Sequence, residues 1–214
     1  MMTQETMAYD HKIRKSLKIK HLAGLDESGT GCVAGPIISA CVILPDNVDL
    51  PLVKDSKKIQ GLHKLRKAVN EVEKNALAIS IGISTNKTVD MIGPLQADRS
   101  AMILALDKIK IEPESLLIDG AREHLLNDSI PEINKKQADS KSLTVAAASV
   151  VATYMQHMIM TNYGRIYHGY AFAENYGYLS IDGKKTLMTK GPCPIHRFRY
   201  KPVNESAQLH NLRR

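Results

Sequence analysis

The sequence predicts an α/β fold in which helices pack on a mixed β-sheet. Apolar runs with the two-residue period of strands alternate along the chain with runs of helical period. The first two apolar runs are close enough in sequence to pair antiparallel, and the later ones are separated by helices. The 214 residues fit one domain, or one domain with a C-terminal extension.

Two strands, a helix and a third strand are predicted first. Residues 21–25 and 33–44 are the paired apolar runs, and a turn follows at 45–51. The segment 54–57 then leads into a helix, because the apolar residues that follow recur at helical spacing: Ile59, Leu62, Leu65, Val69 and Val72. Residues 76–84 alternate apolar and other side chains, which predicts the next strand.

The second half of the chain continues the alternation. A helix is expected from Pro94 to about Leu106, because proline is favoured in a first turn. Short strands are expected at 115–118 and 131–136, and a long apolar helix at 143–160, with Asp139 and Ser140 as its cap. A loop region with two Gly-Tyr pairs leads to a helix at about 182–189, and the basic stretch 196–201 is expected to close the ordered part.

The positive charge of the chain is concentrated near its C-terminus. The formal net charge is +7, and the segment 184–214 holds eight basic residues against the single acid Glu205. A basic region on a neutral body suits a polyanionic partner such as nucleic acid. The alternative is a solvated tail that only adds solubility.

The cysteines and the hydropathy pattern indicate a soluble cytoplasmic protein. Three cysteines without a CxxC pair make a disulfide framework or a zinc site an unlikely reading, and favour a reducing compartment. The first twenty residues carry scattered charges and no apolar stretch of signal-peptide length. No apolar run reaches the ~18 residues of a membrane helix, so no membrane partner is expected.

Four carboxylates stand where an apolar run ends. Asp26 and Glu27 end the first strand, Asp119 ends a later one, and Asp139 precedes the long helix. Taken one at a time, these acids fit an acidic surface turn, a turn residue and a helix cap. Because strand ends and helix starts meet at the edge of an α/β sheet, their joint placement predicts a shared site instead. Asp26 and Glu27 are neighbours on a strand, so only one of them can point into the cleft from a flat strand.

A cleft with four carboxylates requires cations, because the like charges otherwise repel each other. Oxygen ligands alone favour Mg²⁺ or Mn²⁺ over zinc. Two such ions about 4 Å apart can activate a water and stabilise the leaving oxygen in phosphodiester hydrolysis. The glycines beside Asp26 and Glu27 leave bare backbone that can approach a phosphate or a sugar.

The ordered set of motifs resembles ribonuclease HII, a type 2 ribonuclease H. The matching pieces are Ala23-Gly24-Leu25-Asp26-Glu27-Ser28-Gly29-Thr30-Gly31, Ala34-Gly35-Pro36, Asp55-Ser56-Lys57-Lys58, Leu117-Ile118-Asp119-Gly120, Asp139-Ser140-Lys141-Ser142, Val145-Ala146-Ala147-Ala148-Ser149, Gly177-Tyr178 and His196-Arg197. They cover about residues 21–203 in the order of that family.

The resemblance implies a ribonuclease H-like fold, with a five-stranded mixed sheet flanked by helices and a C-terminal helical extension. It implies a metal-dependent endonuclease that hydrolyses the RNA strand of RNA·DNA hybrids or RNA-containing duplexes with two Mg²⁺ or Mn²⁺ ions. The four acids Asp26, Glu27, Asp119 and Asp139 would bind the metal and act in catalysis. The expected parts are a tail at 1–20, a catalytic domain at 21–203 whose helical part starts near 161, and a basic tail at 204–214, in a monomer.

The first loop departs from the family pattern at Thr30. Ribonuclease HII usually has Arg or Lys between the two glycines, whereas the Gly-Thr-Gly of this chain is similar to ribonuclease HIII. The glycines still allow backbone approach to a ribose 2′-OH, the group that separates RNA from DNA. Without the cation, we expect poor excision of a single embedded ribonucleotide, with less effect on longer RNA stretches.

The resemblance also implies substrate contacts, each with a simpler alternative. The candidates are Gly29, Thr30, Gly31, Ser56, Lys57, Arg122, Tyr178, His196 and Arg197. Lys57 is equally compatible with a solvated helix start, Arg122 with pairing to Glu123, and Tyr178 with a packing role. His196 and Arg197 are expected to contact substrate or hold the C-terminal part, and no histidine is assigned as general base, because metal-bound water can supply the nucleophile.

Two functions compete with the hybrid-cleaving enzyme. A non-catalytic hybrid-binding protein would not need clustered acids beside a phosphate backbone, and all four acids are present. A metal-dependent DNA nuclease on the same superfold would not need the glycine loop and Tyr178, which favour recognition of ribose.

Overall fold

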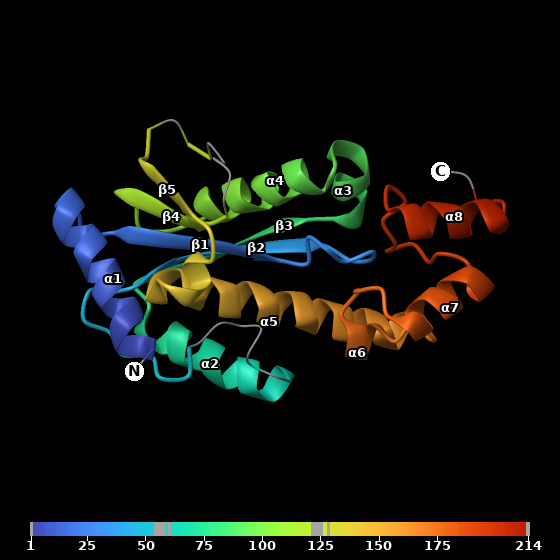
Figure 1. Cartoon of the computed structure of the whole chain (residues 1–214), viewed down its shortest axis with the longest axis horizontal. Helices are drawn as coiled ribbons and strands as arrows, with labels where there is room; N and C mark the ends of the chain where they lie inside the picture. Colours follow the sequence, from blue (N-terminus) through green and yellow to red (C-terminus); the bar gives the residue numbers. More distant parts are fainter. Residues whose placement is uncertain (1, 54–58, 60, 121–125, 128, 213–214) are drawn as a thin grey trace.

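A five-stranded sheet forms the centre of the molecule in a computed structural model, which describes residues 2–53, 59, 61–120, 126–127 and 129–212 (Figure 1). Its strands are β1 (Leu22–Ser28), β2 (Ile37–Ile43), β3 (Ala78–Ser84), β4 (Ser115–Asp119) and β5 (Glu132–Lys135), in the order β3-β2-β1-β4-β5. The pairs β1–β2 and β2–β3 are antiparallel, and β1–β4 and β4–β5 are parallel. The predicted mixed sheet is therefore confirmed.

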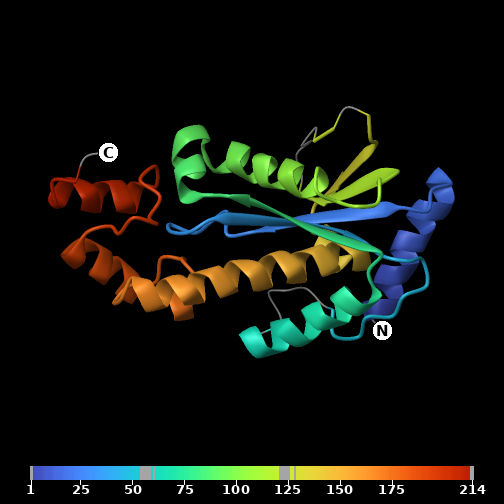
Figure 2. The same ribbon diagram turned by 180° about the vertical axis from the view of Figure 1, so that it is seen from behind.

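Helices cover both faces of this sheet. On one face lie α3 (Asn86–Ile92) and α4 (Pro94–Leu106); on the other lie α5 (Leu143–Ile166) and, beyond it, α2 (Leu62–Asn75) (Figure 2). The short helix α6 (Phe172–Asn175) follows α5, and α7 (Ile181–Lys190) and α8 (Lys201–Leu209) form the C-terminal part at one end of the molecule (Figure 1). The expected helical extension after the sheet is therefore present.

The first part of the central helix α5 is enclosed on all sides, since every residue from Leu143 to Ala152 is buried. A β-carbon on Gly24 of β1 would lie 2.5 Å from the backbone carbon of Thr144, so only glycine allows this close approach. Within the described part of the chain, α5 is the helix long and apolar enough to cross a membrane, but 72% of its most apolar 18-residue window is buried. That burial is typical of a core helix in a globular protein.

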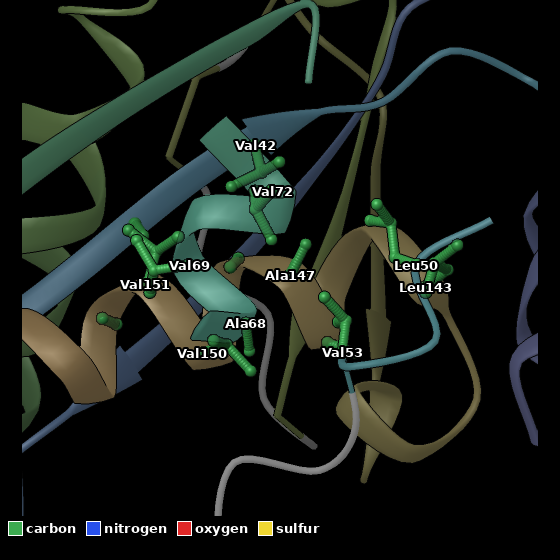
Figure 3. Close-up of a cluster of buried hydrophobic side chains, with 14 of the residues drawn as sticks. Val42, Leu50, Val53, Ala68, Val69, Val72, Leu143, Ala147, Val150 and Val151 are labelled. Carbon is green, nitrogen blue, oxygen red and sulfur yellow. The ribbon is translucent and has the colours of Figure 1, made fainter. Parts of the chain in front are cut away.

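The largest part of the core fills the space between β2, α5 and α2. Figure 3 shows its aliphatic side chains converging from these elements and from the segment before α2: Val42, Leu50, Val53, Ala68, Val69, Val72, Leu143, Ala147, Val150 and Val151. A second cluster, which includes Leu25, Ile118 and Met102, lies on the α4 face of the sheet. The strand ends that carry the acids are thus fixed by packing from both sides.

The structure corrects the prediction of an N-terminal tail at 1–20. Residues of this segment form α1 (Met2–Leu17), which packs near the start of α5 (Figure 1). Asp10 of α1 is buried, and its Oδ2 accepts hydrogen bonds from the backbone N and the Oγ1 of Thr144, at 2.9 and 2.8 Å. The helix is held by a contact that spans 134 residues of sequence, which local patterns do not show.

Two further boundaries differ from the prediction. The cap of α5 is Ser142, whose side chain accepts from Val145 N, while Asp139 lies in a 3₁₀ turn (Ala138–Ser140) before it. The basic tail expected at 204–214 contains most of α8, where Val203 and Ser206 are buried against the C-terminal part. The polar segment has only a narrow apolar face, so its helix depends on these tertiary contacts.

Candidate active site

Three of the four predicted acids converge at the carboxyl end of the parallel strands. Leu25 of β1 pairs with Ile118 of β4, so the next residues, Asp26 and Asp119, are neighbours in the sheet. One carboxylate oxygen from each of Asp26, Asp119 and Asp139 can be chosen so that all three lie within 4.8 Å of one another. This spacing is compatible with a shared divalent cation.

The acid on the 3₁₀ turn is positioned through Asp119. The Oδ1 of Asp119 accepts a hydrogen bond of 2.7 Å from the backbone N of Ala138. This bond fixes the turn against the end of β4 and places Asp139, which is buried, beside the other two carboxylates. The early cap interpretation of Asp139 is wrong, since Ser142 caps the helix.

Glu27 leaves the strand on the opposite side from Asp26, as the alternation of a strand requires. Asp26 accepts a hydrogen bond from Ser149 of α5. Glu27 instead interacts electrostatically with Asp98 of α4, which lies on the other face of the sheet. Glu27 still lines the same pocket as Asp26 and Asp119. It stands beside the three clustered acids rather than among them.

Burial and the charges of neighbouring acids oppose ionisation of Asp26. The pKa of Asp26 is raised well above its ordinary value, first by burial and then by the charge of Glu27, while a hydrogen bond from Ser149 opposes the shift. A buried carboxylate whose neighbours are also acids is stabilised by a cation. The donor set is oxygen only, which fits Mg²⁺ or Mn²⁺. The residues present therefore fit the divalent metal that the sequence predicts.

A fifth acid, Asp98, was missed by the sequence analysis. It lies on the buried side of α4 and is 7% exposed, and its Oδ1 has no hydrogen-bond partner among the described residues. Burial, and then the charge of Glu27, raise the pKa of Asp98 to about 8. The sequence does hold a sign that Asp98 is buried: it lies four residues before Met102, on the apolar face of the helix.

Asp26, Glu27 and Asp119 line a pocket of about 510 Å³. The loop Ser28 to Gly31 lies along it, and His157, Tyr176 and Tyr178 line it as well. Gly29 has φ of 96°, a conformation that favours glycine, and a β-carbon there would lie 2.8 Å from the carbonyl oxygen of Pro36. A side chain at Gly29 would therefore be strained and would collide with this backbone.

Tyr178 lies in the pocket as predicted, and it is 51% exposed. It packs beside the loop, since a β-carbon on Gly31 would lie 3.5 Å from its ring. The side-chain Oγ1 of Thr30 is buried and has no partner among the described residues. Three other candidates, Ser56, Lys57 and Arg122, lie outside the described residues.

Arg197, for which the sequence left a substrate contact or a structural role open, points into the protein in this structure. Arg197 is fully buried. Its Nε donates to Gly35 O at 2.9 Å, and its Nη1 donates to Cys32 O and Thr30 O at 2.7 and 3.1 Å. Tyr200 adds a hydrogen bond from its hydroxyl to Thr30 O, at 2.6 Å. Arg197 therefore holds the backbone that follows the glycine loop, and has no free face for a phosphate.

His196 is likewise enclosed, with an exposed fraction of 2%. Its Nδ1 accepts a hydrogen bond of 3.0 Å from Cys193 N, and its ring packs against the stacked rings of Tyr170 and Phe172. Burial lowers the pKa of His196 to about 4, so the ring is neutral near pH 7. All of these contacts are with residues of the C-terminal part.

The sequence profile of ribonuclease HII matches residues 23–203. The chain belongs to the ribonuclease HII family. A ribonuclease HII from Lactobacillus gasseri is 37% identical over 202 residues, which cover 94% of this chain and 78% of that protein. The ribonuclease HII of Syntrophotalea carbinolica is 40% identical over 187 residues, covering 87% of this chain and 88% of that protein.

Solved structures with the same fold have lower sequence identity. The ribonuclease H2 of Pyrococcus horikoshii superposes with a TM-score of 0.76 at 21% identity, covering 91% of this chain and 99% of that one. Bst-RNase HIII in complex with Mn²⁺ superposes with a TM-score of 0.61 at 17% identity, covering 91% of this chain and 71% of that one. These similarities confirm the ribonuclease H-like fold.

Proposed function

We propose that this protein hydrolyses the RNA strand of RNA·DNA hybrids at the pocket lined by Asp26, Glu27 and Asp119, beside which Asp139 lies. Membership of the ribonuclease HII family makes the chain a metal-dependent endonuclease. The observation that carries the placement of the chemistry is that Asp26, Asp119 and Asp139 approach within 4.8 Å of one another, and that Asp26 and Asp119 line the pocket.

Each acid has a distinct task in this proposal. When bound, the two divalent ions supply a nucleophilic water and stabilise the leaving oxygen. Asp26 and Asp119 would hold the ions from adjacent strand ends, and Asp139 would hold them from the 3₁₀ turn. Glu27 approaches from the other side of β1 and holds the outer part of the site. The rigid sheet and α5 fix these groups before substrate arrives.

The glycine loop supplies the selectivity for RNA. The backbone from Gly29 to Gly31 faces the pocket that contains the acids, so a ribose there can hydrogen-bond through its 2′-OH. Arg197 and Tyr200 hold the Thr30 carbonyl in place from behind the loop. Because Thr30 brings no positive charge, we propose that longer RNA stretches are cut better than single embedded ribonucleotides.

Three finer points complete the proposal. Mg²⁺ and Mn²⁺ are both compatible with carboxylate ligands, and we propose that either supports activity. We propose that the protein acts as a monomer, because a single chain supplies all four acids and the loop. We propose a cytoplasmic location from its three free, buried cysteines.

Cleavage of labelled duplexes tests the function. The wild-type chain is incubated with an RNA·DNA hybrid, a duplex with one ribonucleotide, and an all-DNA duplex, with Mg²⁺, Mn²⁺ or chelator. We expect metal-dependent cutting of the hybrid, weak cutting at one ribonucleotide and no cutting of DNA. Asp119→Asn should abolish cutting, whereas the matched control Asp107→Asn, at the exposed end of α4, should not. Binding without cutting, or cutting of DNA, would contradict the proposal.

A further inference from the structure

An aromatic pair forms the wall of the pocket next to the glycine loop. The rings of His157, from α5, and Tyr176, which follows α6, stack with 3.6 Å between centroids and 8° between planes. Both residues line the same pocket as Asp26 and the glycine loop. The sequence analysis assigned neither residue a role, and the chemistry proposed above does not use them.

The ring of Tyr176 is held in place before any substrate binds. Tyr176 has φ of 50°, in the left-handed region, which few residues other than glycine and asparagine adopt. Its carbonyl accepts hydrogen bonds from Gln156 Nε2 at 2.8 Å and from Cys32 Sγ at 3.4 Å. Gln156 is itself buried under the glycine loop, where a β-carbon on Gly29 would lie 3.2 Å from its Cγ. Backbone strain fixed by such bonds is a feature of functional sites.

The wall carries no positive charge. The Nδ1 of His157 is buried and has no hydrogen-bond partner among the described residues. Burial lowers the pKa of His157 to about 4, so its imidazole is neutral at pH 7. Among the described residues that line the pocket there is neither lysine nor arginine. This part of the pocket is therefore suited to apolar packing and neutral hydrogen bonds, rather than to a phosphate.

The part of a duplex that such a wall can meet is the sugar. Bases inside a duplex are covered by their stacked neighbours, whereas the wide, shallow minor groove of an A-form helix displays ribose edges and 2′-hydroxyls. The flat face of an aromatic ring packs on the carbon–hydrogen groups of a sugar; for a stacked base, loss of such a ring costs about 1–3 kcal/mol, and the lower end, a factor of about ten or less, is expected for a sugar.

We infer that the His157–Tyr176 pair is a specificity-determining wall that packs on the sugar of the nucleotide next to the scissile phosphate. The inference rests on the proposed function, because the acids in the same pocket locate the scissile phosphate. The pair adds contact area on the minor-groove side without adding charge, so binding at this point depends on shape more than on ionic strength.

Steady-state cleavage of the RNA·DNA hybrid by variants of Tyr176 tests the inference. Tyr176→Asn removes the ring and keeps a residue that accepts the left-handed backbone. We expect its KM to rise about tenfold, with kcat changed less than about threefold and the salt dependence of KM unchanged. Tyr176→Phe should keep the wild-type KM. The control Tyr167→Asn, at the end of α5 and outside the pocket, should also keep it.

Two outcomes would overturn the inference. One is a wild-type KM in a folded Tyr176→Asn enzyme; the other is a loss of kcat and of thermal stability with KM unchanged, which indicates a purely structural role. With a hybrid that has an abasic sugar at the neighbouring nucleotide, the KM of Tyr176→Asn should still be about tenfold that of the wild type. If the two KM values become equal, the ring contacts the base and not the sugar. Binding of the hybrid in the presence of chelator, measured by fluorescence anisotropy, should weaken tenfold in Tyr176→Asn even if the protein cleaves nothing. This measurement therefore tests the wall separately from the proposed cleavage activity.

Discussion

Replacing Arg197 by lysine separates a structural arginine from a substrate-binding one. The guanidinium donates three hydrogen bonds of 2.7 to 3.1 Å to the carbonyls of Thr30, Cys32 and Gly35. A lysine keeps the positive charge, but its single ammonium group does not reproduce the planar fork. Two of the three bonds are expected to be lost, which leaves buried carbonyls without donors.

The magnitude follows from the number of bonds lost. A hydrogen bond to a charged group contributes about 1.5–3 kcal/mol, so losing two destabilises the protein by about 3–6 kcal/mol. For a chain of this size, each 1 kcal/mol lowers Tm by roughly 2–4 °C, so a loss of at least about 6 °C is expected. Urea unfolding and a thermal scan of the Arg197→Lys protein measure both quantities.

The salt dependence of KM can refute the structural role of Arg197. If Arg197 only shapes the loop, the slope of log KM against log salt stays at the wild-type value in Arg197→Lys and in Arg197→Met. A phosphate contact would instead reduce that slope by about 1 in Arg197→Met, and the protein would remain stable. A stable variant with a reduced slope would therefore refute the structural role.

Three other predictions concern the acids, the glycines and the first helix. Only the ionised carboxylate binds a cation, and the pKa of Asp26 is raised, so the affinity for Mn²⁺ should weaken as the pH falls toward that raised pKa. Calorimetric titration with Mn²⁺ at several pH values measures this affinity. An affinity that does not change with pH would contradict the prediction. Gly24→Ala should lower the free energy of unfolding by at least about 2 kcal/mol, since its β-carbon meets the backbone of Thr144, whereas Gly31→Ala, with only ordinary contacts, should leave stability near wild type in the same urea assay. Asp10→Ala should cost about 2 kcal/mol in urea unfolding with KM unchanged, and an equal stability would show that the contact with α5 contributes nothing.

Local signals were sufficient for the elements that position the site. Gly93 and Pro94 predict the start of α4, and its end at Leu106 is also as expected. Asp26 and Asp119 were placed together from sequence because each directly follows an apolar strand, and strand ends share an edge of the sheet. The fold class and the family motifs were therefore accessible without coordinates.

Long-range contacts account for what the sequence did not show. The first helix is held by the hydrogen bonds between Asp10 and Thr144, and nothing in the sequence around either residue predicts that the two are in contact. For Arg197 the sequence left open whether it contacts substrate or holds the C-terminal part, and only the folded loop reveals the three carbonyls to which it donates. The stacking of His157 on Tyr176 joins two segments whose local patterns predict a core helix and a loop.

The position of bound Mn²⁺ tests the central claim most directly. Crystals of the protein with an uncleavable RNA·DNA hybrid and Mn²⁺ would be measured for anomalous scattering. The account predicts two peaks enclosed by the carboxylates of Asp26, Glu27, Asp119 and Asp139. Manganese bound elsewhere, with these four side chains free of metal, would contradict it.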